Sequence, residues 1–183
     1  INFALQSDKK FIIVEAPTGS GKSLCGMSIC AGTPGGQSIY AVHTKALQHQ
    51  LNRDFPEAVI LFGRDNYDCI KDDSKTCSQC TATKTRPCDV TYRCTYKVLK
   101  KEAIASRFKV LNYSMLLSEA NFVGGFSNNE LIVIDEADSL DKALYDFITI
   151  TINDKQLKKL DIGLPNYKTA CDNGILDWKR WAG

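Results

Sequence analysis

The sequence predicts an α/β fold in which a parallel sheet carries helices on both faces and is interrupted by a small cysteine-rich insertion. Three observations support this prediction. Apolar runs of strand length alternate with helical segments, the alternation stops at residue 63 and resumes near residue 95, and the polar stretch between them holds five of the eight cysteines. Strands that alternate with helices favour right-handed crossovers, and such crossovers give parallel pairing.

The elements before the insertion follow one another closely. Residues 11–14 (FIIV) are an apolar run of buried-strand length, and a glycine-rich turn leads from them into a helix that ends near Gly32. The sequence then predicts a strand, an amphipathic helix and a second strand, over residues 37–42 (QSIYAV), 44–55 (TKALQHQLNRDF) and 58–62 (AVILF).

The elements after the insertion repeat this alternation. Hydrophobic periodicity predicts a helix over 95–106, a strand over 108–112, a helix over 114–120, a strand over 131–135 (LIVID), a helix over 136–147 and a half-buried strand over 148–152 (ITITI). We therefore expect the first part of the sheet domain over residues 1–63, the insertion over 64–106 and the second part of the sheet domain over 107–150. Residues 151–183 would be the remainder of that domain or the start of a further insertion.

The turn after the first expected strand has the pattern of a phosphate-binding loop. APTGSGKS, residues 16–23, lies between a strand and a helix, which is the context that such a loop needs. Its glycines let backbone N–H groups curl around an anion at the positive end of a helix. Ala16 stands where the strict pattern has its first glycine. We expect Lys22 to reach the β- and γ-phosphates and Ser23 to hold Mg²⁺, with the nucleotide contacted by Thr18, Gly19, Ser20, Gly21, Lys22 and Ser23.

LIVIDEAD, residues 131–138, supplies an acidic partner for this loop. A buried strand that ends in an acid places Asp135 at the carboxyl edge of the sheet, where it can hold Mg²⁺ through water. Glu136 is then positioned to orient and deprotonate an attacking water. Without the loop upstream, an Asp-Glu pair after a strand is typical of an ordinary helix N-terminus. Together the two motifs predict a nucleoside triphosphatase with Lys22, Asp135 and Glu136 as catalytic residues.

Composition and charge limit the other function classes. A net charge of +2 does not by itself indicate a nucleic-acid partner. No apolar run approaches the roughly 20 residues that cross a bilayer, and the opening INFALQSDKK lacks the pattern of a signal peptide. The first residue is not Met, so we expect a piece of a longer protein. We expect an intracellular protein with no membrane partner, in which clustered cysteines bind a metal rather than form disulfides.

Taken in order, the motifs resemble those of superfamily 2 helicases. APTGSGKS and DEAD look like motifs I and II. IYAVHTKALQHQL resembles motif Ia of the XPD/DinG-like iron–sulfur DNA helicases, as do GRDNYDC before the insertion and CTYKVLKKEAIASRFKVLNYSMLL after it. The resemblance runs to about residue 150 and implies a RecA-like P-loop motor domain that uses ATP and Mg²⁺. It also implies a translocase that unwinds DNA, moves from 5′ to 3′ and needs a second motor domain of the same protein.

The resemblance implies that the insertion holds a [4Fe–4S] cluster. Matching to the family selects Cys69 after the Asn-Tyr signature, the C-x-x-C pair Cys77 and Cys80, and Cys94 before the helix. Cys88 is an alternative ligand, in a set with Cys69, Cys80 and Cys94. Such a cluster gives a polar segment a centre to fold around. The alternative is a structural Zn²⁺ site, which the spacing alone favours.

The resemblance also implies a nucleic-acid interface. Thr44, Lys45 and Gln48 of the motif Ia segment would contact the backbone of the bound strand. Tyr96 and Lys97 follow the last cysteine, where basic and aromatic residues interleave as they do in single-strand binding proteins. The expected partners are single-stranded DNA and duplex junctions, with the insertion as a wedge.

Two departures from this family leave alternatives open. Asp138 stands where the family usually has His, and the resulting motif, DEAD, is shared with DEAD-box RNA helicases. Motifs beyond motif II and an arginine finger are not present in this sequence, so we expect the chain alone to hydrolyse ATP poorly. The alternatives are a DEAD-type RNA helicase, a zinc-bearing nucleic-acid-binding ATPase that is not processive, a P-loop kinase with a cysteine-rich lid, and a binding module without enzymatic activity.

Overall fold

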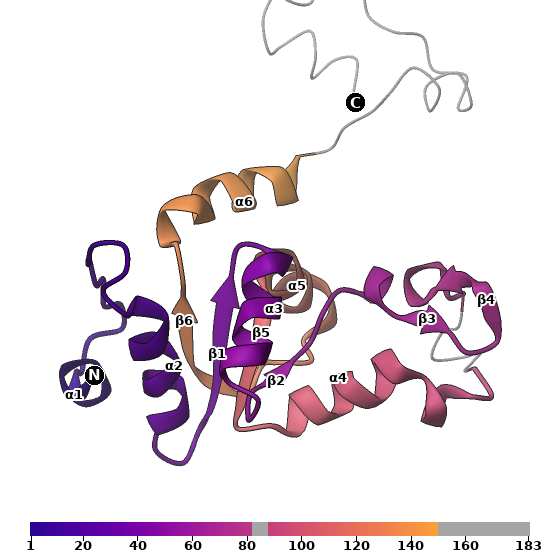
Figure 1. The fold of residues 1–183 in the computed structure, drawn as a ribbon, viewed down its shortest axis with the longest axis horizontal. Helices are drawn as coiled ribbons and strands as arrows, with labels where there is room; N and C mark the ends of the chain where they lie inside the picture. Colours follow the sequence, from indigo (N-terminus) through magenta and orange to yellow (C-terminus); the bar gives the residue numbers. More distant parts are fainter. Residues whose placement is uncertain (82–87, 150–183) are drawn as a thin grey trace, which may run out of the picture. The chain divides into compact units, whose positions relative to one another are not determined.

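A parallel sheet of four strands organises the part of the chain that the structure, a computed structural model, describes: residues 1–81 and 88–149 (Figure 1). The chain divides into two units, Ile1–Phe147 and Ile148–Gly183, and the sheet lies in the first. All its pairings are parallel, and its strands follow the order β2 (Val59–Ile60), β5 (Phe108–Asn112), β1 (Gln37–Val42) and β6 (Asn129–Ile134). The predicted α/β fold class is therefore confirmed.

Helices cover both faces of this sheet. Successive side chains of a strand point to opposite faces, so a strand with apolar residues throughout needs packing partners on both. Tyr40 and Val42 of β1 pack in one cluster with side chains of helices α2 and α3. Ile39 and Ala41 pack in a second cluster, on the other face, with side chains of helices α4 and α5. The bounds of these four helices are Lys22–Gly32, Lys45–Asp54, Thr95–Ala105 and Tyr113–Ser118.

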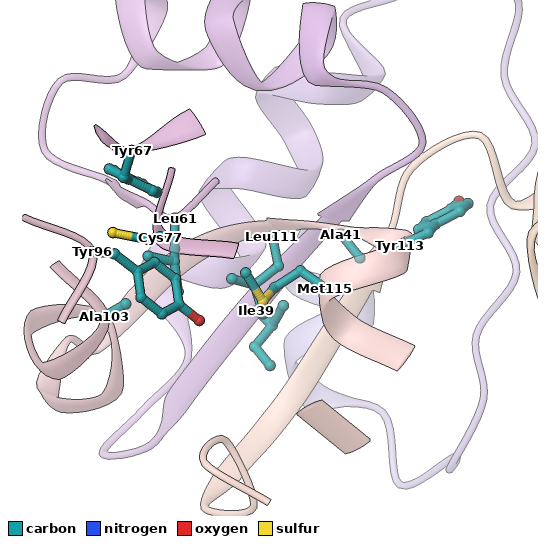
Figure 2. Packing of buried hydrophobic residues seen from close by; sticks show 10 residues of the cluster. All are labelled: Ile39, Ala41, Leu61, Tyr67, Cys77, Tyr96, Ala103, Leu111, Tyr113 and Met115. Carbon is teal, nitrogen blue, oxygen red and sulfur yellow. The ribbon is translucent and has the colours of Figure 1, made fainter. Parts of the chain in front are cut away.

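The insertion leaves the sheet domain after β2 and returns to it through α4 (Figure 1). It contains a short antiparallel hairpin, β3 (Asp68–Cys69) with β4 (Asp72–Thr76), which the sequence did not predict. Tyr67 and Cys77 of this segment are buried in the same cluster as Leu111 of β5 (Figure 2). A segment with few apolar residues of its own is thus anchored on the core of the sheet domain.

The strand predicted over residues 11–14 is wrong. These residues carry no strand, and the side chains of Phe11 and Ile13 are 81% and 95% exposed. A strand needs a neighbour that offers a hydrogen-bonding edge. Among the described residues, β6 pairs only with β1, so the outer edge of β6 is open, but residues 11–14 form no ladder with it. Apolarity indicated that these residues favour burial, but it did not supply a partner strand.

Other element boundaries differ from the prediction in smaller ways. α6 begins at Leu140, after a 3₁₀ turn over Ala137–Ser139, instead of at residue 136, and it ends at Ile148. Most of the strand expected over 148–152 lies outside the described residues. A short helix, α1 (Asn2–Gln6), was not expected. Within residues 1–81 and 88–149, no helix has both the length and the apolar character that spanning a membrane requires.

Gly26 of α2 allows a close approach between this helix and the sheet. A Cβ at this position would lie 2.6 Å from Cε2 of Tyr40 and 3.2 Å from Cγ1 of Val133. We expect Gly26→Ala to lower the free energy of unfolding by about 1–3 kcal/mol, because overpacking outweighs the gain in helix propensity. Urea unfolding measures the change. Gly32→Ala in the same helix is the matched control, since its nearest atom lies 3.4 Å away. Equal stabilities of the two variants would contradict this packing.

Candidate active site

The loop before α2 has the backbone shape of an anion site. Gly19 and Gly21 adopt φ angles of 78° and 81°, in the left-handed region that glycine tolerates best. No atom lies within 4 Å of where a Cβ would stand on either residue, so backbone conformation rather than crowding requires glycine there. Thr18 and Ser20 are exposed between them. This arrangement leaves the loop open to a phosphate at the start of a helix.

Lys22, the first residue of α2, turns its side chain back over this loop. Its Nζ donates hydrogen bonds to the carbonyl oxygens of Ala16 and Pro17, each at 2.9 Å. The amine is therefore already held at the loop by two neutral acceptors. Phosphate oxygens are stronger acceptors for an ammonium group than carbonyl oxygens are, and they would replace these contacts.

Ser23 and Asp135 meet at the carboxyl edge of the sheet. The Ser23 hydroxyl donates to Oδ2 of Asp135 at 3.4 Å, across 112 residues of sequence. The backbone N–H of Asp135 donates to the Ala41 carbonyl at 2.9 Å and extends the β1–β6 ladder by one bond. A hydroxyl and a carboxylate are hard oxygen ligands of the kind that Mg²⁺ prefers. The donor set therefore fits the magnesium ion that the sequence predicts.

Tyr40 lies beneath the Ser23–Asp135 pair. Sequence analysis did not identify it as a residue of the site. Its side chain is 1% exposed. Burial raises the pKa of the Tyr40 phenol, and the neighbouring Asp135 carboxylate raises it further. The strand 37–42 was predicted, but nothing local indicates that Tyr40 faces the acid at the end of a different strand.

Glu136 has a left-handed backbone, with φ 55° and ψ 49°. It is the one residue other than glycine with positive φ in the part of the chain that the structure describes. Its carbonyl accepts hydrogen bonds from the Ser139 amide at 2.9 Å, the Ser139 hydroxyl at 2.8 Å and the Tyr113 hydroxyl at 3.3 Å. A left-handed residue cannot continue a right-handed helix, which explains the late start of α6.

The expected nucleic-acid contacts divide into exposed and buried residues. Thr44 is exposed and caps α3 by accepting from the Leu47 amide at 3.3 Å. Lys45 is exposed, and its Nζ donates to Oδ1 of Asn66 at 3.0 Å. The prediction for Gln48 is corrected, because its side chain is fully buried. Its amide donates to the Leu61 carbonyl at 3.1 Å and accepts from Asn112 at 3.3 Å, so it is not available to a bound strand.

Tyr96 is corrected in the same way. Its side chain is 6% exposed and packs against the Tyr67 ring, with 5.6 Å between the ring centroids (Figure 2). The two rings join α4 to the insertion, so Tyr96 is a core residue. Lys97, the next residue, is exposed. The alternation of basic and aromatic residues in the sequence did not show that Tyr96 is buried and Lys97 exposed.

Cys77 is buried in the insertion, with the thiol of Cys94 beside it. Its Sγ lies 3.6 Å from Sγ of Cys94. Burial raises the pKa of the Cys77 thiol, and the neighbouring thiols of Cys94, Cys69 and Cys80 raise it further. The Cys88 thiol instead contacts Oδ1 of Asp89, at 3.7 Å. Within residues 1–81 and 88–149, no three His, Cys, Asp or Glu side chains are arranged so that they could hold a metal ion. Thiols are metal ligands in kind, but the described residues do not bring three of them into a metal-binding arrangement.

Arg64 holds the C-x-x-C turn of the insertion. Its guanidinium donates to the Cys77 carbonyl, from Nε at 2.9 Å, and also reaches the Cys80 carbonyl, from Nη2 at 3.4 Å. The sequence placed Arg64 in the GRDNYDC motif but did not indicate this contact. A planar guanidinium suits two acceptors on one turn, so Arg64 orients the backbone that carries both cysteines.

The glycine-rich loop, its lysine and the Ser23–Asp135 pair at the edge of a parallel sheet define a P-loop nucleoside triphosphatase. The chain belongs to the DEAD/DEAH box helicase family, whose family model matches residues 1–164. Comparison with curated proteins and with solved structures finds no match. The domain is therefore RecA-like and of the superfamily 2 type, and its family binds nucleic acid and uses ATP and Mg²⁺ in helicase activity.

Proposed function

We propose that this chain is the first motor domain of an ATP-dependent DNA helicase of the XPD/DinG-like branch, which moves from 5′ to 3′ on single-stranded DNA. The observation that carries the proposal is the cysteine-rich insertion between motif Ia and motif II. It is packed into the core of the sheet domain through Tyr67 and Cys77. The match to the helicase family supports the activity. The order of the motifs supports the branch, and the polarity follows from that branch by analogy.

In the proposed reaction, each residue at the carboxyl edge of the sheet has a separate role in ATP hydrolysis. Lys22 leaves the loop carbonyls to bind the β- and γ-phosphates. Ser23 and Asp135, which meet at this edge, would hold Mg²⁺, which would stabilise negative charge on the phosphate oxygens. Glu136 orients the attacking water and accepts its proton. A second motor domain closes the site and supplies an arginine, and repeated closure moves the protein along the strand.

The single strand would cross the same edge of the sheet, on the side where motif Ia begins. Thr44 and Lys45 are exposed there and can donate hydrogen bonds to phosphate oxygens. Lys97 is exposed on α4, close in sequence to the last cysteine, and can add a phosphate contact beside the insertion. The duplex junction would then meet the insertion.

We infer that Cys69, Cys77, Cys80 and Cys94 hold a [4Fe–4S] cluster, with Arg64 fixing the turn that carries two of them. Four thiolates are the ligands of such a cluster. Zn²⁺ is the second candidate, because the 3.6 Å between the sulfurs of Cys77 and Cys94 is close to the edge of a tetrahedral zinc–thiolate site. That edge is about 3.8 Å for Zn–S bonds of about 2.3 Å.

The function is tested with a protein that holds this chain and its second motor domain. We expect single-stranded DNA to stimulate ATP hydrolysis and a 5′-tailed duplex to be unwound. Glu136→Gln should lower the hydrolysis rate at least about 10²-fold with nucleotide binding retained, because only proton transfer is lost. Asp141→Asn, an exposed carboxylate on α6, is the control.

Two results would contradict the proposal. Stimulation by RNA and not by DNA would favour the DEAD-type RNA helicase. No stimulation by either nucleic acid, with turnover intact, would favour another class of P-loop enzyme such as a kinase.

The metal centre is tested on protein purified without oxygen, by measuring iron, acid-labile sulfide and zinc. We expect about four irons and four sulfides per chain. Cys77→Ser should abolish them, because it removes one of the four proposed ligands, whereas Cys88→Ser should not. Cys25→Ser, an exposed thiol on α2, is the matched control. One zinc and no iron would establish the zinc alternative, and retention of metal by Cys77→Ser would overturn the ligand set.

A further inference from the structure

The catalytic glutamate has a backbone conformation that its neighbours must maintain. Residues with a Cβ avoid the left-handed region, and Glu136 occupies it with φ 55°. Ser139 satisfies the Glu136 carbonyl from within the following turn. Contacts within one turn move with that turn, so they cannot fix its orientation relative to the sheet. A contact from another element is needed for that.

Tyr113 supplies this contact from the sheet. It is the first residue of α5 and follows β5 directly. Its hydroxyl donates to the Asp135 carbonyl at 2.5 Å and lies 3.3 Å from the Glu136 carbonyl. The side chain is 1% exposed, and in Figure 2 it lies at the opposite end of the cluster from Tyr67 and Cys77, with its hydroxyl directed away from them. One hydroxyl thus reaches both carbonyls of the motif II Asp-Glu pair.

The ring of Tyr113 has a second neighbour at the same edge of the sheet. It lies beside the imidazole of His43, with 5.8 Å between the ring centroids. His43 immediately precedes Thr44. The two rings line a pocket of about 400 Å³, together with Ser114, Ala143, Asp146 and Phe147.

The chemistry of this pocket suits a nucleobase better than a phosphate. Two aromatic rings that line it, from His43 and Phe147, offer faces for stacking, whereas the Tyr113 ring is buried beside His43. Ser114 can hydrogen-bond to a base edge, and the Asp146 carboxylate repels phosphate. A base of the bound strand seated here would stack on His43, whose ring lies beside the side chain that also holds the glutamate turn.

We propose that Tyr113 is the positioning residue of Glu136 and links its orientation to a base of the single strand seated against His43. This inference rests on the proposed catalytic role of Glu136. The Tyr113 hydroxyl fixes the turn after β6, and a base in the pocket acts on the Tyr113 ring through His43. Tyr113 touches neither the phosphates nor the attacking water, so it acts through the backbone of Asp135 and Glu136.

The test compares Tyr113→Phe with Tyr92→Phe, which removes a hydroxyl from a side chain that is 74% exposed. In a protein with both motor domains, Tyr113→Phe should lower kcat with saturating single strand about tenfold, which corresponds to one lost hydrogen bond. KM for ATP should stay unchanged, because the P-loop contacts remain. The ratio of rates with and without the strand should fall towards one. In amide hydrogen exchange, the Ser139 N–H should lose protection.

Each other outcome has a defined meaning. An unchanged kcat in Tyr113→Phe, with Glu136→Gln inactive, would overturn the positioning role and leave the proposed function standing. Full activity of Glu136→Gln would instead overturn the catalytic role on which this inference rests. A tenfold loss with an unchanged stimulation ratio would overturn the link to the strand. A matching loss in Tyr92→Phe, or a rise in KM with unfolding at lower urea, would show a general structural effect and contradict the proposal.

Discussion

Parallel pairing of β1 with β5 and β6 is the constraint on which the rest of the site depends. It brings the carboxyl ends of three strands, which are distant in sequence, to one edge of the sheet. The ladder runs on as far as the Asp135 amide, which donates to the Ala41 carbonyl. Asp135 is therefore held by backbone bonds, and Ser23 at the start of α2 meets it there. The proposed nucleotide site and the proposed strand contact can share this edge, with Tyr113 between them, because the sheet ends there.

The insertion depends on the same sheet for its stability. Tyr67 and Cys77 complete the cluster beneath β5, so a segment rich in polar residues has no separate core to form. α4 returns the chain to the sheet and carries an ion pair between Lys100 and Glu119, whose side chains are 16% and 4% exposed. Removing one member of so buried a pair leaves an uncompensated charge. The rings of Tyr67 and Tyr96 thus join the insertion to α4, and the Lys100–Glu119 ion pair joins α4 to the rest of the sheet domain.

The sequence predicted features that adjacent residues determine, and it did not predict contacts between elements that are distant in the chain. The strand over residues 108–112 and the glycine turn of the P-loop were found with their correct limits, because their residues determine them directly. Gln48 was misplaced because its partners, the Leu61 carbonyl and Asn112, lie on other elements. The roles of Arg64 and Tyr113 were missed for the same reason. The strand expected at 11–14 is wrong because apolarity within four residues does not show whether a segment pairs, and this one does not pair with the open edge of β6.

Ser23 and Asp135 are proposed to form a magnesium-dependent nucleotide site at the edge of the sheet. This site can be tested by equilibrium binding of a fluorescent ATP analogue to the chain, with and without Mg²⁺. Ser23→Ala should weaken binding about tenfold in Mg²⁺ and leave binding in EDTA unchanged, because only a metal ligand is lost. Ser28→Ala, which removes a hydroxyl bonded to the Leu24 carbonyl in the same helix, should bind as the wild type does. Equal binding by all three proteins in Mg²⁺ would contradict the site.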